Sequence, residues 1–216
     1  MIDKFGRLIS RWEAGWTKSR RLPPAAHVEG GLAISIGEMD RDVEYLALSI
    51  DASQHARLAD LVAASVDAWL TVPTTDREAT EKLLRSRGLE VIAPEWLMRI
   101  DLTRHRTATA PAGYSIDVRF EGDVIIGEAA TSVGVRAAEA RMALAGQDAV
   151  ADEVATDVGH RRRGLATSLM SALTERATQR GARTGLLIAS GEGLRLFEKL
   201  DWQVVVPIVV ACSRRA

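Results

Sequence analysis

A strand, an arginine-rich turn and an amphipathic helix follow one another in the C-terminal half, and this succession restricts the fold of the 216-residue chain more than any other feature. Residues 149–157 fit a strand, and the turn after them reads His-Arg-Arg-Arg-Gly, ending at Gly164. The next segment places Leu165, Leu169 and Leu173 on one helical face. The first N–H groups of a helix lack intrahelical partners and lie at the positive end of its dipole. Because a glycine leaves them open to an anion, the turn predicts a phosphate-binding site.

Three more elements are predicted downstream of the turn. The helix should end near Arg180, because Gly181 follows it. The segment "TGLLIAS" (184–190) is typical of a buried strand. The segment "GEGLRLFEKLDWQVVV" (191–206) predicts a short helix that leads into a last strand.

These motifs resemble those of one known family. The spacing Arg161-x-x-Gly164-x-Ala166 resembles the Arg/Gln-x-x-Gly-x-Gly/Ala signature of the GNAT acyl-CoA N-acetyltransferase superfamily, and residues 196–202 are similar to its "LYEKLGF" element. The order of elements matches over residues 148–212. The resemblance implies an α/β (α+β) GNAT fold, in which helices flank a mixed twisted sheet, with acetyl-CoA (coenzyme A) as cosubstrate and an amine as acetyl acceptor. The alternatives are a non-catalytic acyl-CoA-binding sensor or scaffold, and a structural subunit that binds another phosphate.

The resemblance also assigns cofactor-binding residues. In the family the turn binds the pyrophosphate of coenzyme A. The matching residues here are Arg161, Arg162, Arg163, Gly164, Leu165, Ala166, Thr167 and Ser168. The preceding strand is expected to splay from its neighbour, and a backbone N–H at Thr156, Asp157 or Val158 is expected to polarise the thioester carbonyl. Phe197 is expected to contact the sulfur end of the cofactor.

The general base is predicted on the strand before the turn. Family bases often lie there, which makes Asp152 the first candidate and Glu153 the second. Strand alternation groups Asp152 with Val154 and Thr156 on one face. For either carboxylate, the alternative of a solvated strand end with no catalytic role stays open.

The proton donor is the main departure from the family. Many relatives have a tyrosine where this chain has Phe197, and a phenyl ring cannot donate a proton. Ser190, at the end of the "LLIAS" strand, is the nearest hydroxyl in sequence and a candidate substitute. Otherwise the thiolate leaves unaided or through water, another group donates, or the chain binds the cofactor without efficient turnover.

The N-terminal half contains a possible degenerate copy of this unit. Residues 83–94 align without gaps on residues 196–207, and the elements before each block follow the same order. The segment "DASQHARLADL", at the position of the turn, has no glycine, so only the C-terminal copy is expected to bind coenzyme A. The predicted organisation is a degenerate GNAT-like portion (1–102), a linker (103–113) and an acetyl-CoA-binding GNAT domain (114–216).

Apolar periodicity and turn residues give the other expected elements. In chain order they are a helix over 2–18, an antiparallel pair of strands over 32–37 and 43–50, a helix from Ser53 to about Trp69, a helix from Asp76 to about Arg87, two strands over 89–102 that break at Pro94, and two or three strands over 114–145. The tryptophans Trp12, Trp16 and Trp69 fit core positions better than an aromatic acceptor pocket.

Composition and charge exclude several other classes of protein. A net charge of −1 provides no general attraction for nucleic acid or for a membrane surface. Cys212 is the only cysteine, which excludes an internal disulfide and suits a cytoplasmic protein. The four histidines have no metal-ligand spacing, so no metal is expected. The expected partner is a small-molecule or peptide amine, and a homodimer is possible.

Overall fold

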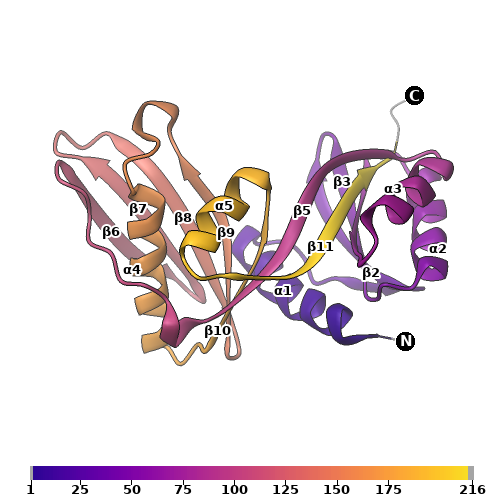
Figure 1. The fold of residues 1–216 in the computed structure, drawn as a ribbon, viewed down its shortest axis with the longest axis horizontal. Helices are drawn as coiled ribbons and strands as arrows, with labels where there is room; N and C mark the ends of the chain where they lie inside the picture. Colours follow the sequence, from indigo (N-terminus) through magenta and orange to yellow (C-terminus); the bar gives the residue numbers. More distant parts are fainter. Residues whose placement is uncertain (1, 214–216) are drawn as a thin grey trace.

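The computed structural model describes residues 2–213, and its strands form one continuous sheet flanked by helices (Figure 1). The helices are α1 (Lys4–Arg20), α2 (Ala52–Ala63), α3 (Arg77–Ser86), α4 (Leu165–Gln179) and α5 (Gly191–Lys199). The strands are β1 (Ala26–Val28), β2 (Gly31–Glu38), β3 (Arg41–Ala47), β4 (Ala68–Pro73), β5 (Glu90–Asp101), β6 (Tyr114–Glu121), β7 (Val124–Thr131), β8 (Arg136–Ala145), β9 (Asp148–Thr156), β10 (Thr184–Ala189) and β11 (Gln203–Cys212). Their order in the sheet is β1-β2-β3-β4-β11-β5-β10-β9-β8-β7-β6. Parallel and antiparallel pairs both occur, which confirms the predicted mixed α/β architecture.

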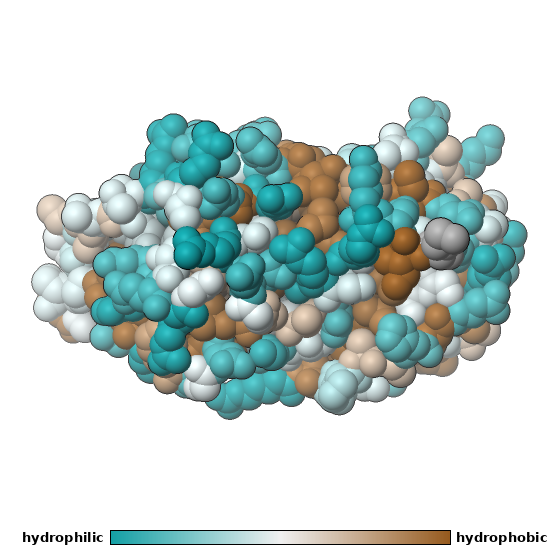
Figure 2. Space-filling model, turned by 90° about the horizontal axis from the view of Figure 1, so that it is seen from below, coloured by the Kyte–Doolittle hydropathy of each residue, from teal (hydrophilic) through white to brown (hydrophobic). Residues whose placement is uncertain are grey.

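The two faces of the sheet are covered by different helices. On β11, Ile208 packs into the core beneath α1, whereas its neighbour Val209 packs into the core beneath α2 and α3. Leu169 and Leu173 of α4 pack on β7, β8 and β9 on the same side as α2 and α3. Helix α1 therefore covers one face, and α2 to α5 cover the other. In the view from below, hydrophilic residues cover most of the surface, with patches of apolar surface between them (Figure 2).

The two halves of the chain exchange a strand at the centre of the sheet. Strand β5, from the N-terminal half, lies between β10 and β11, and β11 lies between β4 and β5 (Figure 1). The orders β3-α2-β4-α3-β5 and β9-α4-β10-α5-β11 are the same, which fits the predicted repeat. Because each half supplies a strand to the other, separating them would expose unpaired edges on both sides.

Two expectations for the N-terminal half are wrong. The helix expected from Ser53 to Trp69 begins after Asp51 and ends at Ala63, and β4 follows it. Asp67, with a φ of 50°, adopts a left-handed turn conformation between the two elements, and Trp69 then lies in a strand whose alternate residues face opposite cores. The two strands expected around Pro94 are one strand, β5. A register shift next to Pro94 accommodates a residue that has no N–H to donate.

The other predicted elements are present within a few residues of their expected bounds. Helix α1 covers the first predicted helix, and Asp76 caps α3 through a bond from the Ala79 N–H to its carboxylate at 3.0 Å. Gly181, after α4, has a φ of 90°, the conformation expected of a glycine that ends a helix.

Candidate functional site

Strands β9 and β10 separate shortly after they begin. They pair in parallel only between residues 148–150 and 184–186. Beyond that point β9 continues to Thr156, and β10 continues to Ala189 with its other edge paired to β5. The facing edges of β9 and β10 therefore have backbone groups that do not pair with each other, as the family resemblance predicts.

The three backbone candidates at the end of β9 differ in their availability. The Asp157 N–H donates to the Ala137 carbonyl at 2.9 Å, so the expectation that it is free for a thioester is wrong. This bond makes Thr156 and Ala138 a non-hydrogen-bonded pair, and the N–H and C=O of Thr156 therefore point away from β8. Val158 lies further on, at the start of a single 3₁₀ turn (Val158–His160). Of the three, the Thr156 N–H points to the unpaired edge.

The start of α4 has the properties of an anion site. Gly164 is its N-cap, with a φ of 84°, and no side chain caps the first helical N–H groups. A Cβ on Gly164 would have only the Pro111 Cγ nearby, at 3.9 Å, so this helix end is open. Leu165 is buried beneath α4, which leaves only its backbone for a ligand. The uncapped N–H groups and the helix dipole favour a negative charge here.

The three arginines of the turn are exposed and add positive charge beside this helix end. The Arg161 Nε donates to the Thr156 carbonyl at 3.2 Å, which ties the turn to the end of β9. The Arg163 guanidinium donates to the Gly159 carbonyl at 3.4 Å. Arg162 has a φ of 62°, a left-handed conformation that is costly for a residue with a Cβ. None of the three forms an ion pair among the described residues, so their charges are not neutralised by a carboxylate.

One hydroxyl assigned to the cofactor is already engaged. Ser168 is buried, and its Oγ bonds to the Thr109 carbonyl at 2.7 Å and to the Gly164 carbonyl at 3.1 Å. The Ala108 N–H in turn donates to the Ser171 Oγ at 2.8 Å. The segment before β6 therefore lies along α4, and the expectation that the Ser168 hydroxyl binds the cofactor is wrong. Thr167 remains half-buried at the helix start.

The corresponding helix of the N-terminal half has no such opening. The Asp51 carboxylate caps α2 by accepting from the Ser53 N–H at 2.8 Å. Asp3 accepts from the Ile50 N–H at 2.8 Å. A cavity of about 360 Å³ lies beside this turn, but Arg57, which lines it, is ion-paired with Glu29 at 3.2 Å. Two carboxylates already bind the N–H groups here, so a phosphate would meet negative charge.

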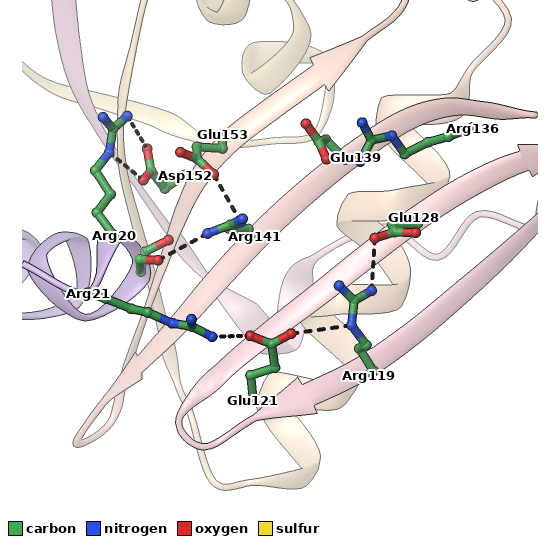
Figure 3. Close-up of polar contacts among 11 residues, drawn as sticks. Arg20, Arg21, Arg119, Glu121, Glu128, Arg136, Glu139, Arg141, Asp152 and Glu153 are labelled. Atoms are coloured by element: carbon green, nitrogen blue, oxygen red, sulfur yellow. Dashed lines mark hydrogen bonds and ion pairs between the residues drawn. The ribbon is translucent and has the colours of Figure 1, made fainter. Parts of the chain in front are cut away.

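Both candidate bases are ion-paired with arginines (Figure 3). Asp152 accepts from Arg20 of α1 at 3.0 and 3.4 Å. Glu153 lies 2.9 Å from Arg141 of β8. The expected grouping of Asp152 with Val154 and Thr156 is wrong, because Asp152 faces α1 whereas Val154 packs into the core beneath α4.

A β-bulge in β9 causes this change of face. Opposite residues 139–141 of β8, strand β9 has one additional residue, and Glu153 adopts a φ of 51° there. An extra residue reverses the alternation of every side chain after it. A single aspartate–glutamate pair in a strand gives no sequence signal for such a bulge.

Ser190 and Phe197 lie beyond the end of β10. Ser190 is at the start of α5, and Phe197 is within α5. Phe197 is 6% exposed, and its ring packs 5.5 Å from the Trp202 ring in the core beneath α4 and α5. The ring belongs to the helix–sheet core, and its expected contact with the cofactor sulfur stays a prediction. Ser190 is exposed and caps α5, with its Oγ accepting from the Gly193 N–H at 3.4 Å.

The structure shows one hydrogen-bonded pair of side chains near the turn that the sequence did not predict. The Tyr114 hydroxyl lies 2.8 Å from the His160 Nδ1, and the two rings meet edge to face. Tyr114 begins β6, and His160 precedes the arginines of the turn. The pair connects the turn to the edge of the sheet. No local pattern joins two residues 46 positions apart.

Several solved structures share the fold of this chain. A GCN5-related N-acetyltransferase from Kribbella flavida superimposes with a TM-score of 0.71 and 17% identity, over 100% of this chain and 98% of that chain. A GCN5-related N-acetyltransferase-like protein from Streptococcus suis gives 0.58 and 12% identity, over 99% and 100%. A tandem GNAT protein from the clavulanic acid biosynthesis pathway gives 0.56 and 14% identity, over 78% and 74%. At these identities the likeness establishes the GNAT fold.

The sequence establishes the family. Residues 78–202, more than half of the chain, match the Acetyltransferase (GNAT) family, and the protein belongs to it. The match starts in α3, continues through the exchanged strand β5 and ends before β11. No curated protein matches the sequence. Within residues 2–213, no helix is long and apolar enough to span a membrane.

Proposed function

We propose that this protein transfers the acetyl group of acetyl-CoA to an amine, and that the turn from Arg161 to Thr167 binds the pyrophosphate of the cosubstrate. The observation that carries the proposal is the open start of α4, where the first N–H groups are uncapped and the three preceding arginines form no ion pair among the described residues. This turn directly follows the strand that separates from β10. An anion site and unpaired strand edges in succession suit a ligand with a phosphate group and an extended arm.

The capping of α2 supports a single cosubstrate site. The Asp51 carboxylate accepts from the Ser53 N–H at the start of α2, whereas no side chain caps the start of α4. We therefore assign cosubstrate binding to the C-terminal portion, and shaping of the acceptor side to the N-terminal portion together with α1.

The residues around the unpaired edges suggest how acetyl transfer would proceed. Acetyl-CoA supplies an acetyl group that is activated as a thioester. The Thr156 N–H points toward the unpaired edge, where it can polarise a carbonyl oxygen. The exposed Ser190 hydroxyl, at the start of α5, is the proposed proton donor to the thiolate. Asp152, the base predicted from the sequence, would have to leave Arg20 in order to accept a proton.

One observation favours the alternative of a non-catalytic acyl-CoA sensor. Phe197 occupies the position of the usual tyrosine, and its ring is buried against Trp202. Two measurements on the same protein separate the alternatives: calorimetric titration with coenzyme A, and release of free thiol from acetyl-CoA across a panel of amines. An enzyme gives binding and thiol release, whereas a sensor gives binding alone. Absence of binding contradicts both.

The arginines of the turn provide a test of the electrostatic part of this proposal. Arg161→Ala and Arg163→Ala should each weaken coenzyme A binding about 10- to 100-fold, because a charge-assisted bond contributes roughly 1.5–3 kcal/mol. The loss should shrink at high salt, since salt screens exposed charges. Calorimetry at two ionic strengths measures both effects. Arg136→Ala is the matched control, because Arg136 pairs with Glu139 on β8. Equal effects of the control and of the turn variants would contradict the site.

A further inference from the structure

The exchanged strand β5 brings a carboxylate from the N-terminal half to the end of β10. Trp96 is the last residue of β5 that pairs with β10, opposite Ala189. Glu95 precedes Trp96 in β5 and lies beside Ser190, the residue that follows β10. At Ser190 the chain leaves the sheet and enters α5, which packs on the α4 face. At this level no strand separates β5 from the unpaired edge of β9. Glu95 therefore borders the region where the proposed thioester would lie.

The Glu95 side chain lies on the α1 face of the sheet. Leu97, two residues further along β5, and Ile208, the partner of Glu95 on β11, both pack into the core beneath α1. Asp152 also lies on this face, through its bond to Arg20 of α1. The α4 and α5 face is the side of the phosphate turn. The turn would bind the cofactor from the α4 and α5 face. Glu95 therefore lies on the other face, from which an acceptor can approach the thioester.

Glu95 is the carboxylate without a partner in this part of the structure. Among the described residues, its carboxylate accepts no hydrogen bond and forms no ion pair, although the side chain is half-buried. The neighbouring Arg41 is paired with the buried Glu44 at 2.9 Å, and Glu44 also accepts from the Thr71 hydroxyl at 2.5 Å. Because Arg41 is bonded to Glu44, the Glu95 carboxylate has no ion-pair partner of its own among the described residues, and a cationic group could pair with it.

The environment of Glu95 also suits proton transfer. Burial raises the pKa of Glu95 above the usual range of a glutamate, while Arg41 opposes the shift and Glu44 adds to it. From α3, Arg77 donates to the Glu95 backbone carbonyl at 3.4 Å and lies over the Trp96 ring, so its charge is directed away from the carboxylate. A half-buried carboxylate with a raised pKa is a better proton acceptor near neutral pH than an exposed one.

We propose that Glu95 is the catalytic residue that binds the ammonium group of the acceptor and takes its proton, and that the acceptor is an amine without a carboxylate of its own. This inference rests on the proposed function. The Glu95 carboxylate accepts one proton from the ammonium, and the nitrogen lone pair then forms the C–N bond to the acetyl carbon as the C–S bond breaks. The electron pair leaves on sulfur, the thiolate takes a proton from the Ser190 hydroxyl, Ser190 takes the second proton of the nitrogen, and Glu95 returns its proton to solvent.

The test uses the full chain and four variants. Thiol release from acetyl-CoA is measured for the wild type, Glu95→Gln, Glu95→Asp, Asp152→Asn and the control Glu128→Gln, with tyramine and tyrosine as an amine pair that differs by one carboxylate. We expect Glu95→Gln to lower kcat about 10²- to 10⁴-fold, the range of general-base catalysis, with coenzyme A affinity unchanged by calorimetry. Glu95→Asp should recover part of the rate, and Glu128→Gln should match the wild type. The wild-type rate should rise with pH through the pKa of Glu95, and Glu95→Gln should lack that rise.

The outcomes separate this inference from the proposed function. Failure of the wild type to bind coenzyme A overturns the proposed function itself. Wild-type turnover that Glu95→Gln leaves within twofold overturns the role of Glu95 alone, as does a large loss in Asp152→Asn with none in Glu95→Gln. Tyrosine as a better acceptor than tyramine overturns the acceptor class. Binding without turnover on either amine overturns the role of Glu95 and favours the sensor. If Glu95→Gln fails to fold, the pH profile of the wild type and the rate of Glu95→Asp decide.

Discussion

Replacing Gly164 by leucine is expected to weaken coenzyme A binding about 100-fold while the protein stays folded. The side chain would cover the uncapped N–H groups at the start of α4, and the loss of one or two charge-assisted bonds, each about 1.5–3 kcal/mol, accounts for this factor. The structure has room for the side chain, since a Cβ at this position approaches only Pro111. Calorimetry gives the affinity, and thermal unfolding confirms the fold.

Gly181→Leu is the matched control for this experiment. Gly181 has a φ of 90°, against 84° for Gly164, and a Cβ there also meets open space. Both variants therefore suffer a similar backbone strain of about 1–2 kcal/mol, at opposite ends of α4. Only Gly164→Leu should lose coenzyme A. Equal affinity in the two variants would remove the turn from the site.

Gly6→Ala is expected to destabilise the protein by about 3 kcal/mol or more, although alanine is the better helix former. Gly6 lies in α1, and a Cβ there would stand 1.8 Å from the Leu48 carbonyl oxygen at the end of β3. The neighbour is backbone and cannot rotate away, so α1 must move off the sheet, and such overpacking exceeds the usual gain from helix propensity. Denaturant unfolding measures the difference.

Gly191→Ala gives the opposite expectation in the same assay. Gly191 begins α5, and a Cβ there meets nothing within 4 Å. Because the added methyl group meets no clash, the higher helix propensity of alanine should stabilise the protein by about 0.5–1 kcal/mol. If both variants stabilise the protein, then α1 does not rest on β3 as closely as the structure shows.

The phosphate turn and its helix could be predicted from the sequence because they depend on local chemistry. A strand, then arginines, then a glycine at a helix start determine the local backbone geometry by themselves. The open N-terminus of α4 then follows from Gly164 with no knowledge of the remaining fold. The caps at Asp76 and Gly181 were predictable for the same reason.

The acceptor side could not be predicted, because it depends on contacts between distant segments. The bulge at Glu153 reverses the faces of β9, and the exchange of β5 and β11 brings Glu95 to the end of β10. Asp152 was the natural candidate base by position in the strand, yet its partner Arg20 lies 132 residues away on α1. Pairings of this kind are decided by the assembled sheet and leave no mark in the local pattern.

Amide hydrogen exchange, measured with and without saturating coenzyme A, is a direct test of cofactor binding at the start of α4. The ligand should slow exchange at the backbone amides of residues 164–167, where no side chain caps the helix. The amides at the start of α2, which Asp51 already caps, should exchange as before. Protection confined to α2, or no change at residues 164–167 when the ligand is saturating, would contradict coenzyme A binding at the start of α4.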